Sequence, residues 1–163
     1  MITVYYRQRL LPLQALREHF GRLYGVTVGV LGLAFKPNTD DLREAPSLDL
    51  IRALVEEGAM VRAYDPKVVA AAGRELPNSV HVVEDLPSCT QGAQALVLMT
   101  EWPEIVAADW AVVASHTKPP RFLFDGRNAL DAAQMQALGF DYRGVGRAAK
   151  PSTSTGTTTD GEV

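Results

Sequence analysis

Residues 26–34 read VTVGVLGLA, an almost unbroken run of apolar and β-branched residues. A run of this kind is typical of a strand that is covered on both faces. Further along, Pro46 and Ser47 begin a pattern of apolar residues at helical spacing, and Gly58 marks its end. MVRAYD at residues 60–65 then has the composition of a second strand. This part of the chain therefore predicts one strand–helix–strand unit.

Strand and helix patterns continue to alternate through the rest of the chain. Further strands are predicted at residues 80–83, 95–100, 121–126 and 140–146, and helices at 67–75, 85–91, after Trp102 and at 129–138. Such alternation predicts a mainly parallel sheet with helices on both faces, joined by right-handed crossovers. We therefore expect a doubly wound, Rossmann-like α/β fold. Ligands in this architecture bind beyond the carboxyl ends of the strands, where the strand order reverses.

The two ends of the chain depart from this alternation. Apolar residues recur at intervals of three and four over residues 10–20, which predicts a helix there in spite of Pro12. The last segment holds no large apolar residue before its final valine and cannot add to a core. We accordingly divide the chain into an N-terminal helix or linker remnant, a ligand-binding domain and a disordered tail, at residues 1–25, 26–146 and 147–163.

Composition narrows the classes of function. The chain has 163 residues, of which 47% are hydrophobic, enough for one ordinary core. Its net charge of -3 and scattered basic residues argue against a nucleic-acid partner. The single cysteine, Cys89, excludes an internal disulfide and a cysteine-rich zinc site, so we expect no metal. The first residues are too polar for a signal peptide or a membrane span. We expect a cytoplasmic protein without a membrane partner.

The loop after the first strand carries an unusual number of charges. It reads FKPNTDDLREAPS, and its charged residues are Lys36, Asp40, Asp41, Arg43 and Glu44. Neither a dinucleotide fingerprint nor a phosphate-loop pattern is present, because no third glycine follows Gly32 and a proline follows Lys36. Lys36 and Arg43 can still bind phosphate oxygens, with the carboxylates as their anchors. Local chemistry alone leaves a merely solvated loop as the alternative.

Several blocks of sequence occur in the order and at the spacing of one known family. They are VGVLGLAFKPNTDDLREAPSLDLIRALVEEGAMVRAYDP, ALVLMTEW, FDGRNALD and GFDYRGVGR, starting at residues 28, 95, 124 and 139. Together they resemble the C-terminal domain of the UDP-glucose 6-dehydrogenases, over roughly residues 13–147. Relatives that act on GDP-mannose or UDP-N-acetylmannosamine have similar loops, but this loop is more similar to that of the UDP-glucose branch.

The resemblance implies an NAD-dependent oxidoreductase family that oxidises the C6 alcohol of UDP-glucose to the carboxylate of UDP-glucuronate through a cysteine-bound intermediate. These enzymes combine an NAD domain, a central helical dimerisation domain and a C-terminal nucleotide-sugar domain. This chain resembles only the last of them. The resemblance implies that Phe35, Lys36 and Arg127 bind the UDP-sugar. It also implies that Arg43 reaches across a domain cleft towards NAD.

No catalytic residue is predicted in this chain, because the family's nucleophile belongs to the central domain. Cys89 is predicted to pack in the core, and Trp102 to fasten a helix to the sheet. We therefore expect the chain alone to be inactive and to need the NAD and central domains as partners, in cis or in trans. The first dozen residues depart from the family. A fragment, a split-gene subunit and a free, non-catalytic UDP-sugar-binding module therefore stay open as interpretations.

Overall fold

The fold is built on a parallel sheet, as expected. The computed structural model describes residues 2–34, 42, 45–67 and 69–146. The strands are β1 (Thr27–Leu31), β2 (Met60–Tyr64), β3 (His81–Val83), β4 (Ala95–Leu98), β5 (Phe122–Asp125) and β6 (Asp141–Gly144). They form one sheet in the order β3-β2-β1-β4-β5-β6, and each neighbouring pair is parallel. This order is the doubly wound Rossmann arrangement, so the predicted fold class is confirmed.

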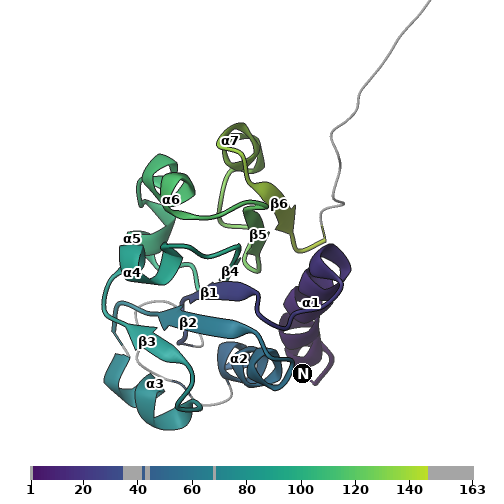
Figure 1. Ribbon diagram of the computed structural model, residues 1–163, viewed down its shortest axis with the longest axis vertical. Helices are drawn as coiled ribbons and strands as arrows, with labels where there is room; N and C mark the ends of the chain where they lie inside the picture. The colour runs from purple at the N-terminus through teal and green to yellow at the C-terminus, as the bar shows by residue number, and fades with distance from the viewer. Residues whose placement is uncertain (1, 35–41, 43–44, 68, 147–163) are drawn as a thin grey trace, which may run out of the picture.

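Helices cover both faces of this sheet. They are α1 (Ile2–Phe20), α2 (Pro46–Glu56), α3 (Val69–Glu75), α4 (Leu86–Thr90), α5 (Pro103–Val106), α6 (Trp110–His116) and α7 (Ala132–Ala137). Figure 1 shows α1, α2 and α3 along one side of the sheet and α4, α5 and α6 along the other. In the part of the chain that the structure describes, no helix is both long and apolar enough to cross a membrane.

Alternating side chains of the central strands build two separate cores. Val28 and Val30 of β1 pack with α1 and α2, whereas Leu31 packs with α4 and α5. β4 follows the same alternation, with Val97 on the first side and Leu98 on the second. All these side chains are fully buried. Burial on both faces explains why the strands are continuous apolar runs rather than alternating ones.

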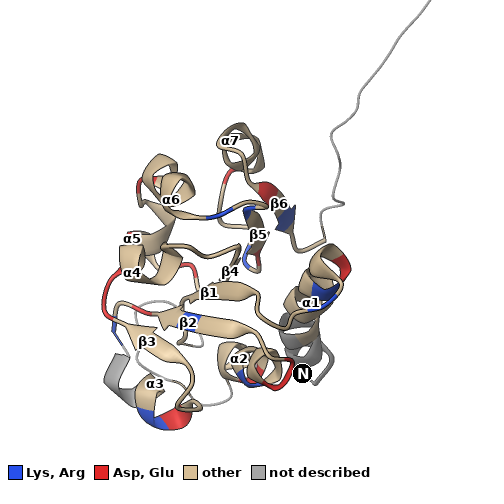
Figure 2. Ribbon diagram, viewed as in Figure 1, with Lys and Arg blue, Asp and Glu red and all other residues tan. Residues whose placement is uncertain are grey.

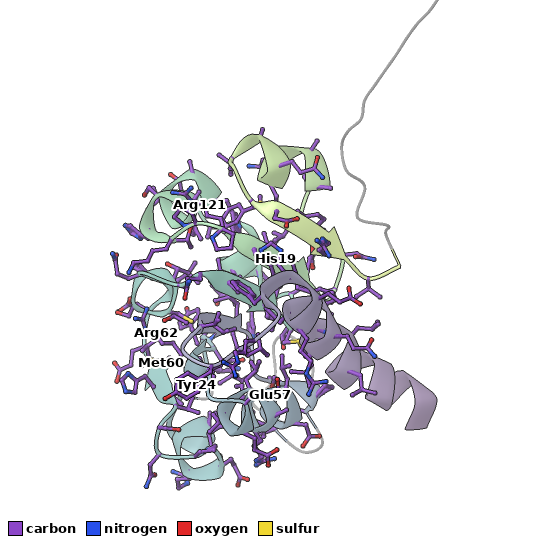
Figure 3. The ribbon with its side chains drawn as sticks, turned by 45° about the vertical axis from the view of Figure 1, so that its right-hand side comes forward. His19, Tyr24, Glu57, Met60, Arg62 and Arg121 are labelled. Atoms are coloured by element: carbon purple, nitrogen blue, oxygen red, sulfur yellow. The ribbon has the colours of Figure 1, made fainter. Side chains whose placement is uncertain are left out.

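Helix α1 covers the half of the sheet that the crossover helices leave open. The connections from β4 to β6 all run on the far side, so β5 and β6 need another cover on the near side. Leu16 of α1 is fully buried there. The ring of His19 lies 4.5 Å from that of Phe122, and its Nδ1 lies 3.2 Å from Asp141 Oδ2 on β6 (Figure 3). The helix begins at Ile2, earlier than predicted, and runs through Pro12 without a break.

Candidate functional site

The carboxyl ends of β1 and β4 lie side by side at the centre of the sheet, where the chain leaves towards opposite faces. β1 leads to α2 on one face, and β4 leads to α5 and α6 on the other. Ligands of doubly wound proteins bind in the crevice at such a switch point. It is bordered by residues 32–34 after β1, 99–102 after β4 and 126–127 after β5. We call these the carboxyl-end segments.

Asp65, the residue after β2, ties the first two carboxyl-end segments together. It is completely buried. Its Oδ2 accepts hydrogen bonds from the backbone N–H groups of Leu33 at 2.8 Å and Ala34 at 3.0 Å, and from the indole Nε1 of Trp102 at 2.9 Å. Its Oδ1 accepts one from the N–H of Lys67 at 2.8 Å. Hydrogen bonds to a carboxylate are roughly twice as strong as those between neutral groups. This carboxylate therefore holds the segments after β1 and β4 firmly to the end of β2.

The first two carboxyl-end segments also touch directly. Gly32 has a φ of +90°, and a Cβ there would come within 2.6 to 2.8 Å of the Cβ, N and O of Thr100. The hydroxyl of Thr100 donates a hydrogen bond to the carbonyl of Ala34 at 2.5 Å. On the other side, the hydroxyl of Ser47 at the start of α2 donates one to the carbonyl of Leu33 at 2.7 Å. Only glycine fits at residue 32.

Of the residues predicted to bind the UDP-sugar, the structure describes Arg127. It lies in the turn after β5. Its Nε donates a hydrogen bond to the carbonyl of Met99 at 2.9 Å. The same nitrogen forms an ion pair with Glu101 Oε1 at 3.4 Å, a buried oxygen without a hydrogen bond among the described residues. The Arg127 side chain is 23% exposed. A guanidinium held at this edge suits the oxygens of a phosphate or carboxylate ligand.

A second buried carboxylate shapes the turn that carries Arg127. Asp125, at the end of β5, accepts a hydrogen bond from the backbone N–H of Arg127 at 3.1 Å through Oδ1. Its Oδ2 accepts one from the N–H of Leu130 and one from the hydroxyl of Tyr142, each at 2.8 Å. The turn is therefore fastened to β6 as well as to β5.

The other predicted binding residues, Phe35, Lys36 and Arg43, lie outside the described residues, as do Asp40, Asp41 and Glu44. The structure places the neighbouring residues Ala34 and Ala45, both of which are buried. Figure 2 shows basic and acidic positions interspersed along the described elements rather than gathered on one face. Among the described residues, no group of three or more potential metal ligands lies together.

An open cavity of about 600 Å³ lies at the opposite, amino-terminal edge of the sheet. Its lining includes Arg17 and Glu57, which form an ion pair, and Tyr24, which is 79% exposed (Figure 3). The cavity is remote from the switch point and is formed around the ends of α1 and α2. The carboxyl edge, with its buried carboxylates and held guanidinium, is the better candidate site.

Cys89 is a core residue, as predicted. Its side chain is fully buried on α4, and its Sγ lies 3.7 Å from the carbonyl of Val30. Burial raises the pKa of the thiol to about 12, against the partial opposing effect of Arg62. Because the thiolate is the reactive form, this cysteine is chemically inert in the folded chain. Trp102 is 3% exposed and bonded to Asp65, which confirms its predicted packing role.

The raised pKa of Cys89 predicts a specific loss of stability in alkali. The folded chain holds the thiol proton up to about pH 12, whereas the unfolded chain releases it near 9.0, the ordinary pKa of a cysteine thiol. The stabilisation is therefore complete below pH 9 and is lost as the pH rises from 9 to 12. In this window the free energy of unfolding should fall by up to about 1.4 kcal/mol per pH unit more in the native chain than in Cys89→Ala. Urea unfolding at a series of pH values measures both, and equal slopes would contradict the assignment.

Comparisons with known proteins identify the family of this chain. Residues 29–132 match the family described as "UDP-glucose/GDP-mannose dehydrogenase family, UDP binding domain". A UDP-glucose 6-dehydrogenase of Pseudomonas aeruginosa is 45% identical over 147 residues, which cover 86% of this chain and 32% of that protein. The UDP-glucose 6-dehydrogenase TuaD of Bacillus subtilis is 38% identical and is covered to the same 32%.

Solved structures show the same partial coverage. A UDP-glucose dehydrogenase from the archaeon Pyrobaculum islandicum superposes with a TM-score of 0.70 at 34% identity, over 90% of this chain and 30% of that one. The chain thus spans about a third of the length of the relatives it matches. Matched in sequence over most of its length and in fold, this chain belongs to the UDP-glucose/GDP-mannose dehydrogenase family and carries that family's UDP binding domain.

Proposed function

We propose that this chain holds a UDP-sugar at the carboxyl edge of its sheet, as the C-terminal domain of an NAD-dependent UDP-glucose 6-dehydrogenase. The observation that carries the proposal is the placement of Arg127, partly exposed and fixed to Met99 beside the switch point. A diphosphate is the part of the ligand that such a guanidinium recognises. Identity of 45% to a UDP-glucose 6-dehydrogenase supports UDP-glucose as the sugar nucleotide. Phe35 and Lys36 are the proposed further contacts.

Oxidation of the sugar requires parts that we assign to other domains, in cis or in trans. Cys89 is buried with a raised pKa and is no candidate nucleophile. The proposed division of labour is that this domain binds and orients the nucleotide, while the NAD domain and a central domain supply the dinucleotide and the reactive cysteine. Arg43 would face NAD. A reducing cytoplasm suits the single free thiol.

Arg127→Ala should weaken UDP binding by about 1.5 to 3 kcal/mol, the range for a hydrogen bond to a charged group. Isothermal titration of the chain with UDP, raised as far as the millimolar range, measures the change.

Lys36→Ala should have a similar effect, and Arg43→Ala should have little effect because its proposed ligand is a different molecule. GDP titrated in parallel reports the preference for the base.

Arg143→Ala is the matched control. Arg143 is 26% exposed, and its Nε lies 3.5 Å from Asp141 Oδ1, so its exposure and its acidic partner resemble those of Arg127. Its guanidinium, however, lies over the ring of Phe122 on the α1 side of the sheet. UDP affinity should survive this change. Equal losses in the two variants, or no UDP binding by the native chain, would refute the proposed function.

A further inference from the structure

We propose that Asp65 is a positioning residue for nucleotide binding, which acts on Arg127 through Trp102 and the segment 99–102. The inference rests on the proposed function, since it names what keeps the nucleotide-binding guanidinium in place. Asp65 Oδ2 accepts the hydrogen bond of Trp102 Nε1 at 2.9 Å, at one end of the segment. At the other end, the carbonyl of Met99 accepts the hydrogen bond of Arg127 Nε at 2.9 Å.

The segment between these two contacts is short and firmly held. Met99 donates its backbone N–H to the carbonyl of Leu31 at 2.9 Å, and the hydroxyl of Thr100 bonds to Ala34. Thr100 is completely buried and Trp102 is 3% exposed. A closely packed segment of this kind has little room to adjust. If the bond to Asp65 is lost and Trp102 moves, the Met99 carbonyl therefore moves as well.

Because Asp65 is buried, we assign it a positioning role and not direct contact with the ligand. In dinucleotide-binding Rossmann domains, an acidic residue after the second strand binds the ribose hydroxyls of the ligand. Asp65 has the same place in the topology, after β2, but it is 0% exposed and its oxygens accept hydrogen bonds from Leu33, Ala34, Lys67 and Trp102. The carboxylate therefore organises the walls of the crevice from within.

Trp102→Phe tests the link with little disturbance to packing, because it removes the indole N–H and keeps an aromatic ring. Trp110→Phe is its matched control: Trp110 is also 3% exposed and also donates its indole N–H, to the carbonyl of Ile105 at 3.1 Å, but it has no bond to Asp65. Titration of each chain with UDP should show about fivefold weaker binding for Trp102→Phe and less than about a twofold change for Trp110→Phe. Asp65→Asn, if it folds, should also weaken binding.

A double-mutant cycle distinguishes positioning from general weakening of the fold. If Asp65 and Trp102 act through Arg127, Trp102→Phe should cost no further affinity in a chain that already carries Arg127→Ala. The same fold-loss in both backgrounds, or an equal loss in Trp110→Phe, would overturn the inference and leave the proposed function intact.

A second readout does not depend on UDP. The NMR resonance of the Arg127 Nε–H group, which is bonded to Met99, should shift in Trp102→Phe and stay in place in Trp110→Phe. If the native chain fails to bind UDP, the proposed function fails, and this resonance still decides whether Asp65 and Trp102 set the position of Arg127. An unmoved resonance in Trp102→Phe would refute the link.

Discussion

Gly32→Ala should destabilise the domain by about 2 to 5 kcal/mol, the sum of left-handed backbone strain and forced overlap in a packed interior. The φ of Gly32 is +90°, and the added Cβ would lie 2.6 Å from Thr100 Cβ and 2.7 Å from its backbone nitrogen. Backbone atoms of the neighbouring segment cannot rotate away as a flexible side chain would. Because domains are stable by only about 5 to 15 kcal/mol, the loss should be obvious in urea unfolding.

Gly25→Ala separates the two causes of that loss. Gly25 has a similar φ of +80°, but nothing lies within 4 Å of a Cβ built there. The substitution should therefore cost only the backbone term, about 1 to 2 kcal/mol. If Gly32→Ala proves no more damaging than Gly25→Ala, the close approach of the first two carboxyl-end segments is not as tight as the structure shows.

The fold could be predicted because the local signals for strands and helices agree with the architecture that they build. The apolar run at β1 has the form of a strand buried on both faces, and such strands occur where helices cover both sides of a parallel sheet. The start of α2 was marked by Pro46 and its end by Gly58, whose φ is +86° in the structure. Local signals of this kind specify elements without any knowledge of what packs against them.

The role of α1 was harder to predict, because local signals do not report what an element packs against. Its apolar spacing marked a helix at residues 10–20, but nothing local shows which surface it covers. That surface exists only because the crossovers after β4 all lie on the other side of the sheet. The pairing of His19 with Phe122 and Asp141 is a long-range consequence of topology, which sequence periodicity does not report.

The candidate site was predicted in part. The family resemblance named Arg127, which directly follows the strand predicted at residues 121–126, and the structure places it at the carboxyl edge, after β5. Asp65 was missed as a site residue, although an acidic residue after the second strand of a βαβ unit was a usable signal. What the sequence could not show is that its partners, Ala34 and Trp102, come from two other strands' ends.

Asp65→Ala should cost about 3 to 5 kcal/mol of unfolding free energy, because it strips buried donors of their acceptor rather than merely deleting a contact. The N–H groups of Leu33 and Ala34 and the indole of Trp102 would all lose the oxygen they share. Thermal and urea unfolding measure the loss, with Asp131→Ala as the control. Asp131 is exposed and accepts a single N–H bond, from Gln134 at the start of α7, so its loss should cost only about 1 kcal/mol.

Asp65→Asn sharpens the interpretation of that loss. The amide keeps one oxygen, which can still accept the three bonds now made to Oδ2, but it presents an NH₂ group to the N–H of Lys67. Its cost should therefore fall between those of Asp131→Ala and Asp65→Ala. A cost as small as that of Asp131→Ala in both Asp65 variants would mean that water enters the site and accepts the hydrogen bonds that the carboxylate had accepted. Water could then replace the carboxylate, and Asp65 would not be needed to hold β1, β2 and the segment after β4 together.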